Sequence, residues 1–173
     1  DLHKEYRRQR QMCIRDSFSS ISATDIIVYP PLFKDQEING HAVQTYCLES
    51  GQSLFDVTPL AQSLADCLRD QGYDFNAINC GGNEPLNQER EQWSDGANAF
   101  TLAPGKIINY ARNKETTAAL QQAGYRQIDA ADFINNDADL MADDQQIVIT
   151  ISSAELPRGR GGPRCLTMPL DRA

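Results

Sequence analysis

The chain has 173 residues, which suits one domain, and its 16 basic and 24 acidic side chains give a net charge of −8 at pH 7. The acidic balance argues against a general nucleic-acid-binding protein, and no apolar run reaches the roughly 18 residues of a transmembrane helix. Five cysteines without a C-x-x-C pair argue against a disulfide framework or a zinc site. We therefore expect reduced thiols, no metal, and a cytoplasmic protein.

The opening segment, residues 1–17, differs from the rest of the chain. It carries five basic and three acidic groups and has no helical or strand periodicity. The run Gln11-Met12-Cys13-Ile14-Arg15-Asp16-Ser17 resembles the translated adapter scars found at the ends of environmental reading frames. We predict that residues 1–17 form a non-native or disordered arm, with an ordinary flexible arm as the alternative, and that residues 18–173 form the folded part.

Three strands and one helix are predicted in the first half. Pro30 and Pro31 stop a β-branched run, which predicts the first strand. Thr58 and Pro59 supply a cap and a first-turn proline for a helix that Gly72 ends, and leucines at four-residue intervals share one face of it. The predicted elements are strands at 25–29, 42–48 and 73–78, a helix at 58–72 and a polar segment at 80–98.

The second half begins with a predicted hairpin around Pro104-Gly105. Asn113 is expected to cap the next helix and Gly124 to close it. The predicted elements are strands at 99–102, 106–110, 126–128, 146–151 and 166–170, a helix at 114–123, a short helix with a loop at 129–141, and a loop at 155–165. The order strand–strand–helix–strand thus occurs twice, at a spacing of roughly 70–80 residues, which predicts an α/β fold with an internal structural repeat.

Chemistry is most strongly indicated in the segment 156–165, where three arginines and three glycines precede Cys165. Glycines let a backbone approach a ligand closely, and arginines can bind a carboxylate through two parallel hydrogen bonds. A positive field favours the reactive thiolate of a cysteine. The segment therefore indicates an anion clamp beside a nucleophile. A solvated basic turn or a flexible nucleic-acid segment is the alternative.

A second cluster, Arg90–Asn98, contains the only tryptophan, Trp93, among polar residues. Buried Asn, Asp and Gln side chains must be hydrogen-bonded, so this cluster predicts a network that braces a site rather than one that reacts. The two histidines, His3 and His41, form no base-and-orienter pair, so the sequence offers a candidate nucleophile without a general base.

Several separated motifs occur in an order that resembles the C-terminal part of the arginine deiminases, from about residue 18 to residue 173. They are Arg90-Glu91-Gln92-Trp93 with Asp95-Gly96-Ala97-Asn98, Ala103-Pro104-Gly105, Tyr110 with Arg112-Asn113, and Arg158-Gly159-Arg160-Gly161-Gly162 before Cys165 and Pro169. The resemblance implies the pentein fold, an α/β propeller of strand–strand–helix–strand modules, of which this chain would hold about two and part of another. It also implies the cofactor-free hydrolysis of L-arginine to L-citrulline and ammonia.

The resemblance assigns roles to three residues. Cys165 would be the nucleophile that attacks the guanidinium carbon, Arg160 would hold the α-carboxylate of the substrate, and Gly159 would line the same loop. The family's His-x-Asp pair should lie just before Phe18, where this chain differs, and the carboxylates that clamp the guanidinium belong to an N-terminal half that the chain lacks. We therefore predict a truncated enzyme that is inactive alone and that associates through exposed apolar faces.

Two other interpretations stay open. An amidinotransferase or a dimethylarginine hydrolase of the same superfamily would share the cysteine nucleophile, although the combined Arg-Gly-Arg-Gly-Gly and Arg-Glu-Gln-Trp motifs favour the deiminase. A non-catalytic module could use the basic loop to bind an anionic partner.

Overall fold

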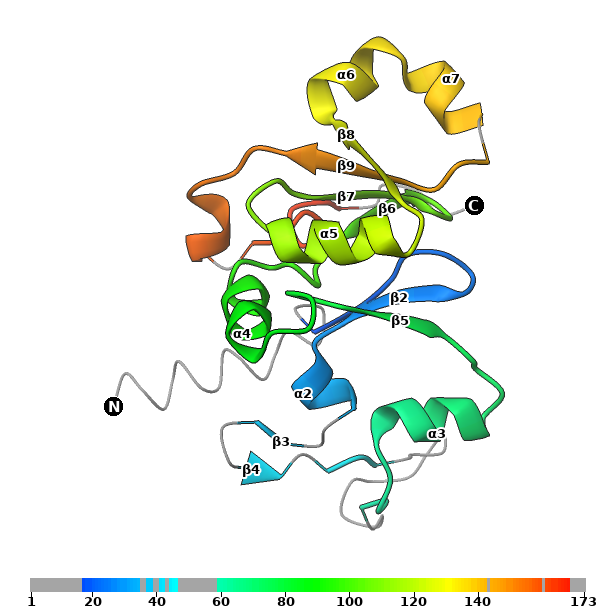
Figure 1. Ribbon diagram of the computed structural model, residues 1–173, viewed down its shortest axis with the longest axis vertical. Helices are drawn as coiled ribbons and strands as arrows, with labels where there is room; N and C mark the ends of the chain where they lie inside the picture. Colours follow the sequence, from blue (N-terminus) through cyan, green and yellow to red (C-terminus); the bar gives the residue numbers. More distant parts are fainter. Residues whose placement is uncertain are drawn as a thin grey trace. The chain divides into compact units, whose positions relative to one another are not determined.

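The computed structural model describes residues 17–34, 37–38, 41–42, 44–46, 59–142, 144–159 and 161–168. The chain divides into two compact units, one made of residues 1–29 and 76–173 and the other of residues 30–75. Strands and helices alternate along the chain, so the predicted α/β class is confirmed (Figure 1). Among the described residues, no helix has the length and apolar character needed to cross a bilayer.

A three-stranded sheet opens the first unit, with the order β1 (Phe18–Ser20), β2 (Asp25–Val28) and β5 (Asn76–Asn79). β1 is antiparallel to β2, and β5 is parallel to it. All four residues of β2 are buried, which agrees with the β-branched run that predicted this strand. The predicted strand at 73–78 begins later than expected, at Asn76, and the exposed Tyr73 before it stacks on Phe75.

A four-stranded sheet of the same unit has the order β6 (Phe100–Ala103), β7 (Lys106–Tyr110), β9 (Ile147–Ile151) and β8 (Arg126–Asp129). The predicted hairpin is confirmed, since β6 pairs antiparallel with β7 across a turn in which Gly105 has a φ of +77°. β9 lies between β7 and β8 and is parallel to both. β9, the most apolar strand of this sheet, is thus the central one of the three parallel strands.

The two sheets share one arrangement, but it differs from the predicted strand–strand–helix–strand repeat in both halves, since β8, the last strand predicted for the second half, pairs with β9 and not with β7. In each sheet an antiparallel hairpin is followed by a strand parallel to its second member, β5 beside β2 and β9 beside β7. The hairpin partner of β2 is β1, however, and not the predicted strand at 42–48, which lies in the other unit. β1 went unpredicted because Phe-Ser-Ser is too short and polar to show a strand pattern.

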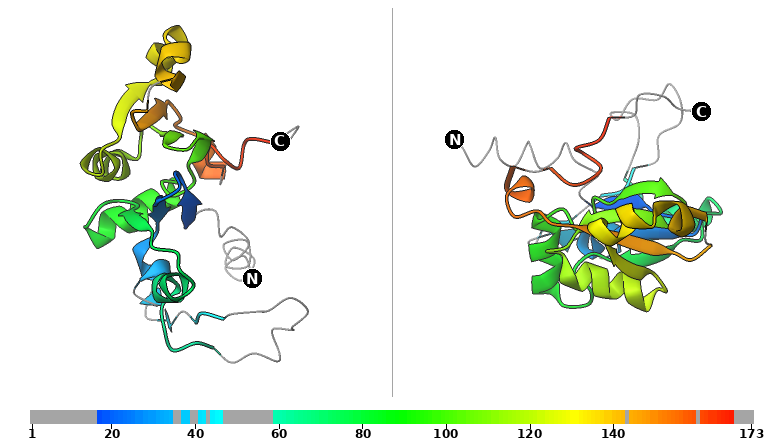
Figure 2. Two further views of the ribbon diagram at one scale, coloured as in Figure 1. Left: turned by 90° about the vertical axis from the view of Figure 1, so that its right-hand side faces the viewer. Right: turned by 90° about the horizontal axis from the view of Figure 1, so that it is seen from above.

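Helix α5 (Lys114–Gln122) runs alongside the four-stranded sheet (Figures 1 and 2). Its Leu120 packs in a core with Ile107 and Val148 of that sheet and with Ile27 and Ile78 of the smaller sheet. The helix ends as predicted before Gly124, whose φ is +100°. This core joins the two sheets into one unit.

Two helices and a short 3-10 turn complete the first unit beyond β8 and β9. They are α6 (Ala130–Asn135), α7 (Asp137–Ala142) and η3 (Leu156–Gly159). The Asp129 side chain caps α6 by accepting a hydrogen bond from the Ala131 amide at 2.9 Å. The predicted final strand at 166–170 is wrong for residues 166–168, which form a turn and coil, and residues 169–170 lie outside the described part.

The polar segment 80–98 contains a helix that was not predicted, α4 (Pro85–Trp93). Pro85 occupies its first turn, a favoured position for proline. The helix has no apolar stripe that would reveal it, because its two buried residues are the polar Gln88 and Glu91.

The second unit contains α2 (Pro30–Phe33), β3 (Glu37–Ile38), β4 (His41–Ala42) and α3 (Leu64–Asp70). The predicted helix start at Thr58 is wrong. Ser63 is the actual cap, its hydroxyl accepting from the Asp66 amide, whereas Leu60 pairs with Thr45 in an isolated bridge. The end of the helix before Gly72, whose φ is +87°, is as predicted.

A buried carboxylate, Asp25, links the two sheets of the first unit. It is 6% exposed and accepts hydrogen bonds from the side chains of Ser22, Asn76, Tyr125 and Gln146 at 2.9–3.1 Å. Burial by itself raises the pKa of Asp25, but these four hydrogen bonds outweigh it and hold the pKa below the ordinary value of 3.8. The charged form is therefore the one that the fold stabilises.

The Asp25→Asn variant is expected to lose less stability on acidification than the unmodified chain. Because the folded-state pKa is depressed, the contribution of Asp25 is fully present above the unfolded value near 3.8 and is lost as the pH falls through the folded value. Urea unfolding at pH 5 and pH 3 measures this difference in both proteins. An equal loss of unfolding free energy in the two would contradict the assignment.

Candidate functional site

Cys165 lies in a turn that follows Gly162 and is half-buried. Its Sγ accepts a hydrogen bond from Nδ2 of Asn98 at 2.8 Å, although the two residues are 67 positions apart in sequence. The sulfur therefore sits beside a polar side chain in a partly accessible place rather than in an apolar interior.

Asn98 closes a turn of residues 95–98. It is fully buried, and its backbone amide donates to the Asp95 carbonyl at 3.0 Å. Asp95 has a φ of 61°, and the Gly96 carbonyl accepts from Nδ2 of Asn109 at 2.9 Å. Asn98 was predicted to belong to a bracing cluster but was not predicted to contact the nucleophile. The sequence signal that could have pointed to Asn98 is the block Asp95-Gly96-Ala97-Asn98, which follows the only tryptophan, Trp93.

The cysteine loop, residues 161–168, packs closely against this turn. A Cβ built on Gly162 would lie 2.4 Å from Cγ of Asn98, so only glycine allows the approach. The Tyr110 hydroxyl donates to the Gly161 carbonyl at 2.6 Å, and the Leu166 amide donates to the Gly162 carbonyl at 3.2 Å. The glycines of this segment were expected to let the backbone approach a ligand, but Gly162 lets the backbone approach the Asn98 side chain.

The predicted anion clamp is only partly described. Arg160 lies outside the described residues. Gly159 is exposed at the end of η3, and a Cβ built there would meet nothing within 4 Å. Arg158 is exposed and pairs with Glu155 at 3.1 Å. The roles of Arg160 and Gly159 therefore stay predictions.

The bracing role of the tryptophan cluster is confirmed at Glu91. This residue is 8% exposed, and its carboxylate accepts from the Glu115 amide at 2.9 Å, the Thr116 amide at 2.8 Å and the Thr116 hydroxyl at 2.7 Å. A carboxylate at a helix N-terminus satisfies orphan amides and complements the helix dipole. Glu91, which belongs to α4, thus caps the N-terminus of α5.

Asn113 occupies the predicted cap position of α5, but its side chain makes no cap hydrogen bond. It instead accepts from the Ser94 hydroxyl at 2.6 Å and donates to the Ser94 carbonyl at 3.1 Å. The prediction of a side-chain cap by Asn113 is therefore wrong, because the nearby Glu91 carboxylate takes the amides at this end.

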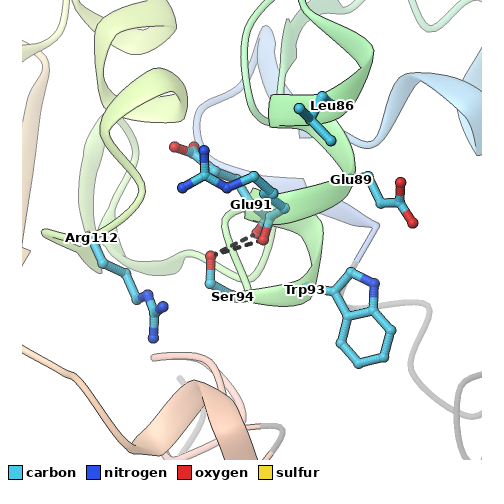
Figure 3. A pocket seen from close by; sticks show the side chains of 7 residues that line it. Leu86, Glu89, Glu91, Trp93, Ser94 and Arg112 are labelled. Atoms are coloured by element: carbon cyan, nitrogen blue, oxygen red, sulfur yellow. Dashed lines mark hydrogen bonds between the residues drawn. The ribbon is translucent and has the colours of Figure 1, made fainter.

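A hollow of about 430 Å³ lies over α4 and is lined by Leu86, Glu89, Arg90, Glu91, Trp93, Ser94 and Arg112. Figure 3 shows Arg112 and Trp93 on either side of Ser94. A neighbouring hollow of about 330 Å³ adds Pro157 and Arg158. Cys165 lines neither hollow.

The other described cysteines have different surroundings from Cys165. Cys80 is fully buried, and burial raises the pKa of its thiol to about 12, which keeps it protonated and inert. Cys67 is half-buried on α3. Within the part of the chain that the structure describes, no cluster of three His, Cys, Asp or Glu side chains could hold a metal ion.

Comparison with known proteins agrees with the family resemblance of the sequence. The family profile described as arginine deiminase matches residues 6–172. The chain belongs to the arginine deiminase family. The match begins inside the opening segment, so the boundary at residue 17 remains a prediction.

Curated relatives named arginine deiminase include one from Listeria monocytogenes serotype 4a (strain HCC23), which is 34% identical over 90% of this chain. One from Mycoplasma capricolum subsp. capricolum is 42% identical over 64% of the chain, and one from Latilactobacillus sakei is 36% identical over 77%. These alignments cover 32%, 23% and 28% of the respective relatives. The chain thus spans about a third of the length of the curated relatives it matches.

Proposed function

We propose that this chain is the C-terminal part of an arginine deiminase that hydrolyses L-arginine to L-citrulline and ammonia, with Cys165 as the nucleophile. The observation that carries the proposal is the half-buried Cys165 sulfur, which accepts a hydrogen bond from the buried Asn98 at 2.8 Å. This contact can hold the sulfur in one position for attack on the substrate carbon. Family membership supplies the substrate class.

The proposed reaction has two covalent steps. The Cys165 thiolate adds to the guanidinium carbon, and ammonia leaves after one amino group takes a proton, which produces a thiouronium bound to sulfur. Water then adds to that carbon and gives up both of its protons, one replacing the proton used on the leaving amino group and the other taken up by the released ammonia, and the carbon–sulfur bond breaks to release citrulline and restore the thiolate. Asn98 holds the sulfur in place through both steps.

The remaining assignments complete the same proposal. Arg160 binds the substrate carboxylate in the loop that Gly159 lines, and the two hairpin-plus-parallel-strand sheets are modules of a pentein propeller. The proton donor and the carboxylates that bind the guanidinium come from residues outside this chain. The chain alone therefore gives no citrulline, and the complete enzyme works without a metal or another cofactor in the cytoplasm.

An amidine electrophile, which resembles the guanidinium head of arginine, tests this function on the purified chain. Peptide mapping by mass spectrometry is expected to show Cys165 labelled at least about tenfold faster than Cys67, because the Cys165 sulfur accepts a hydrogen bond from Asn98 and lies in the proposed substrate site. Cys80, being fully buried, is expected to stay unlabelled. A parallel citrulline assay is expected to detect no turnover.

Equal labelling of Cys165 and Cys67 would contradict a prepared nucleophile and favour the non-catalytic anion-binding alternative. Citrulline formation that disappears in Cys165→Ala would confirm the nucleophile but contradict the inactivity of the isolated chain. Turnover of methylated arginines or amidino transfer in place of citrulline formation would favour the other enzymes of the superfamily.

A further inference from the structure

Two consecutive residues of β7, Asn109 and Tyr110, contact the two segments that meet at Cys165. Asn109 donates from Nδ2 to the Gly96 carbonyl at 2.9 Å, in the turn that carries Asn98. Tyr110 donates from its hydroxyl to the Gly161 carbonyl at 2.6 Å, in the loop that carries Cys165. A single strand thus holds both partners of the Asn98–Cys165 contact.

The strand is well suited to fix positions. Asn109 and Tyr110 are both fully buried, and β7 is paired on both sides, with β6 and with β9. The two residues are also joined, since Oδ1 of Asn109 accepts from the Tyr110 amide at 2.7 Å. Buried, satisfied polar groups of this kind specify one local arrangement.

The Tyr110 hydroxyl remains a donor at neutral pH. Burial raises the pKa of Tyr110, and the nearby charges of Asp95 and Cys165 raise it further. A protonated hydroxyl can then keep its bond to the Gly161 carbonyl throughout the neutral range.

We propose that Asn109 and Tyr110 are positioning residues that set the Cys165 sulfur at hydrogen-bond distance from Asn98. The effect on deimination rests on the proposed function, but the positioning itself is a property of this chain. Loss of the Tyr110 hydroxyl would free the cysteine loop and uncouple Asn98 from the sulfur while leaving the phenyl ring in the core.

The test is a double-mutant cycle read by alkylation of Cys165 with iodoacetamide, followed by peptide mapping. Asn98→Ala is expected to change the alkylation rate about threefold or more, because the sulfur loses the hydrogen bond that holds it beside the turn of residues 95–98. In a Tyr110→Phe background, the same Asn98→Ala change is expected to have no effect on the rate. Tyr125→Phe, which removes another buried hydroxyl that bonds to Asp25 at 3.1 Å, is the matched control and should preserve the Asn98 effect.

An Asn98 effect of equal size with and without the Tyr110 hydroxyl would overturn the proposal, and so would the absence of an Asn98 effect in the unmodified chain. If Tyr110→Phe fails to fold, hydrogen exchange in the unmodified chain tests the positioning role instead. The Gly161 and Leu166 amides should then exchange as slowly as those of β7, and exchange as fast as in exposed loops would overturn positioning. Iodoacetamide does not resemble arginine, so these results are independent of the amidine labelling that tests the function.

Discussion

Replacement of Glu91 by alanine is expected to lower the free energy of unfolding by about 2–4 kcal/mol. The substitution leaves the Glu115 and Thr116 amides and the Thr116 hydroxyl without the carboxylate that accepts from them. Thr116 is fully buried, so water cannot readily replace the lost acceptor at that residue. The change also removes a negative charge from the N-terminus of α5.

Urea unfolding followed by the fluorescence of Trp93, the only tryptophan, measures this loss. Glu89→Ala is the matched control, because Glu89 lies on the same helix and is exposed. Its effect should stay within about 0.5 kcal/mol. Equal effects of the two substitutions would show that the contact between α4 and α5 does not depend on the Glu91 carboxylate.

Gly162→Ala is expected to cost about 1–3 kcal/mol and to separate the cysteine loop from Asn98. The added Cβ would lie 2.4 Å from Cγ and 2.5 Å from Cβ of Asn98, and that side chain is fully buried in a close-packed interior. Relief therefore requires displacement of the loop, which breaks the 2.8 Å contact between Asn98 and Cys165. Faster hydrogen exchange at the Leu166 amide should accompany the loss of stability.

Gly159→Ala is the matched substitution in the same segment, since a Cβ there meets nothing within 4 Å. It is expected to leave the exchange of the Leu166 amide unchanged. If Gly162→Ala behaved in the same way, the close packing of the cysteine loop on Asn98 would not hold in solution.

Local patterns in the sequence predicted the elements whose formation depends on their own residues. Apolar β-branched runs predicted β2 and β9, since both strands are largely buried and need no polar face. Glycines after α3 and α5 predicted both helix ends, because each of these positions has a positive φ. Helix α4 was missed because its buried face is polar, which leaves no apolar period.

The sequence also placed Cys165 beside a glycine-rich basic loop, since the neighbours of a residue along the chain follow from order alone. Only the tertiary structure decided which distant groups face these residues. Asn98 meets Cys165 across 67 positions, Glu91 rather than Asn113 caps α5, and β9 rather than β8 pairs with β7. Each of these outcomes is a competition between partners for the same hydrogen-bonding group, and packing of the whole chain determines which partner lies within reach.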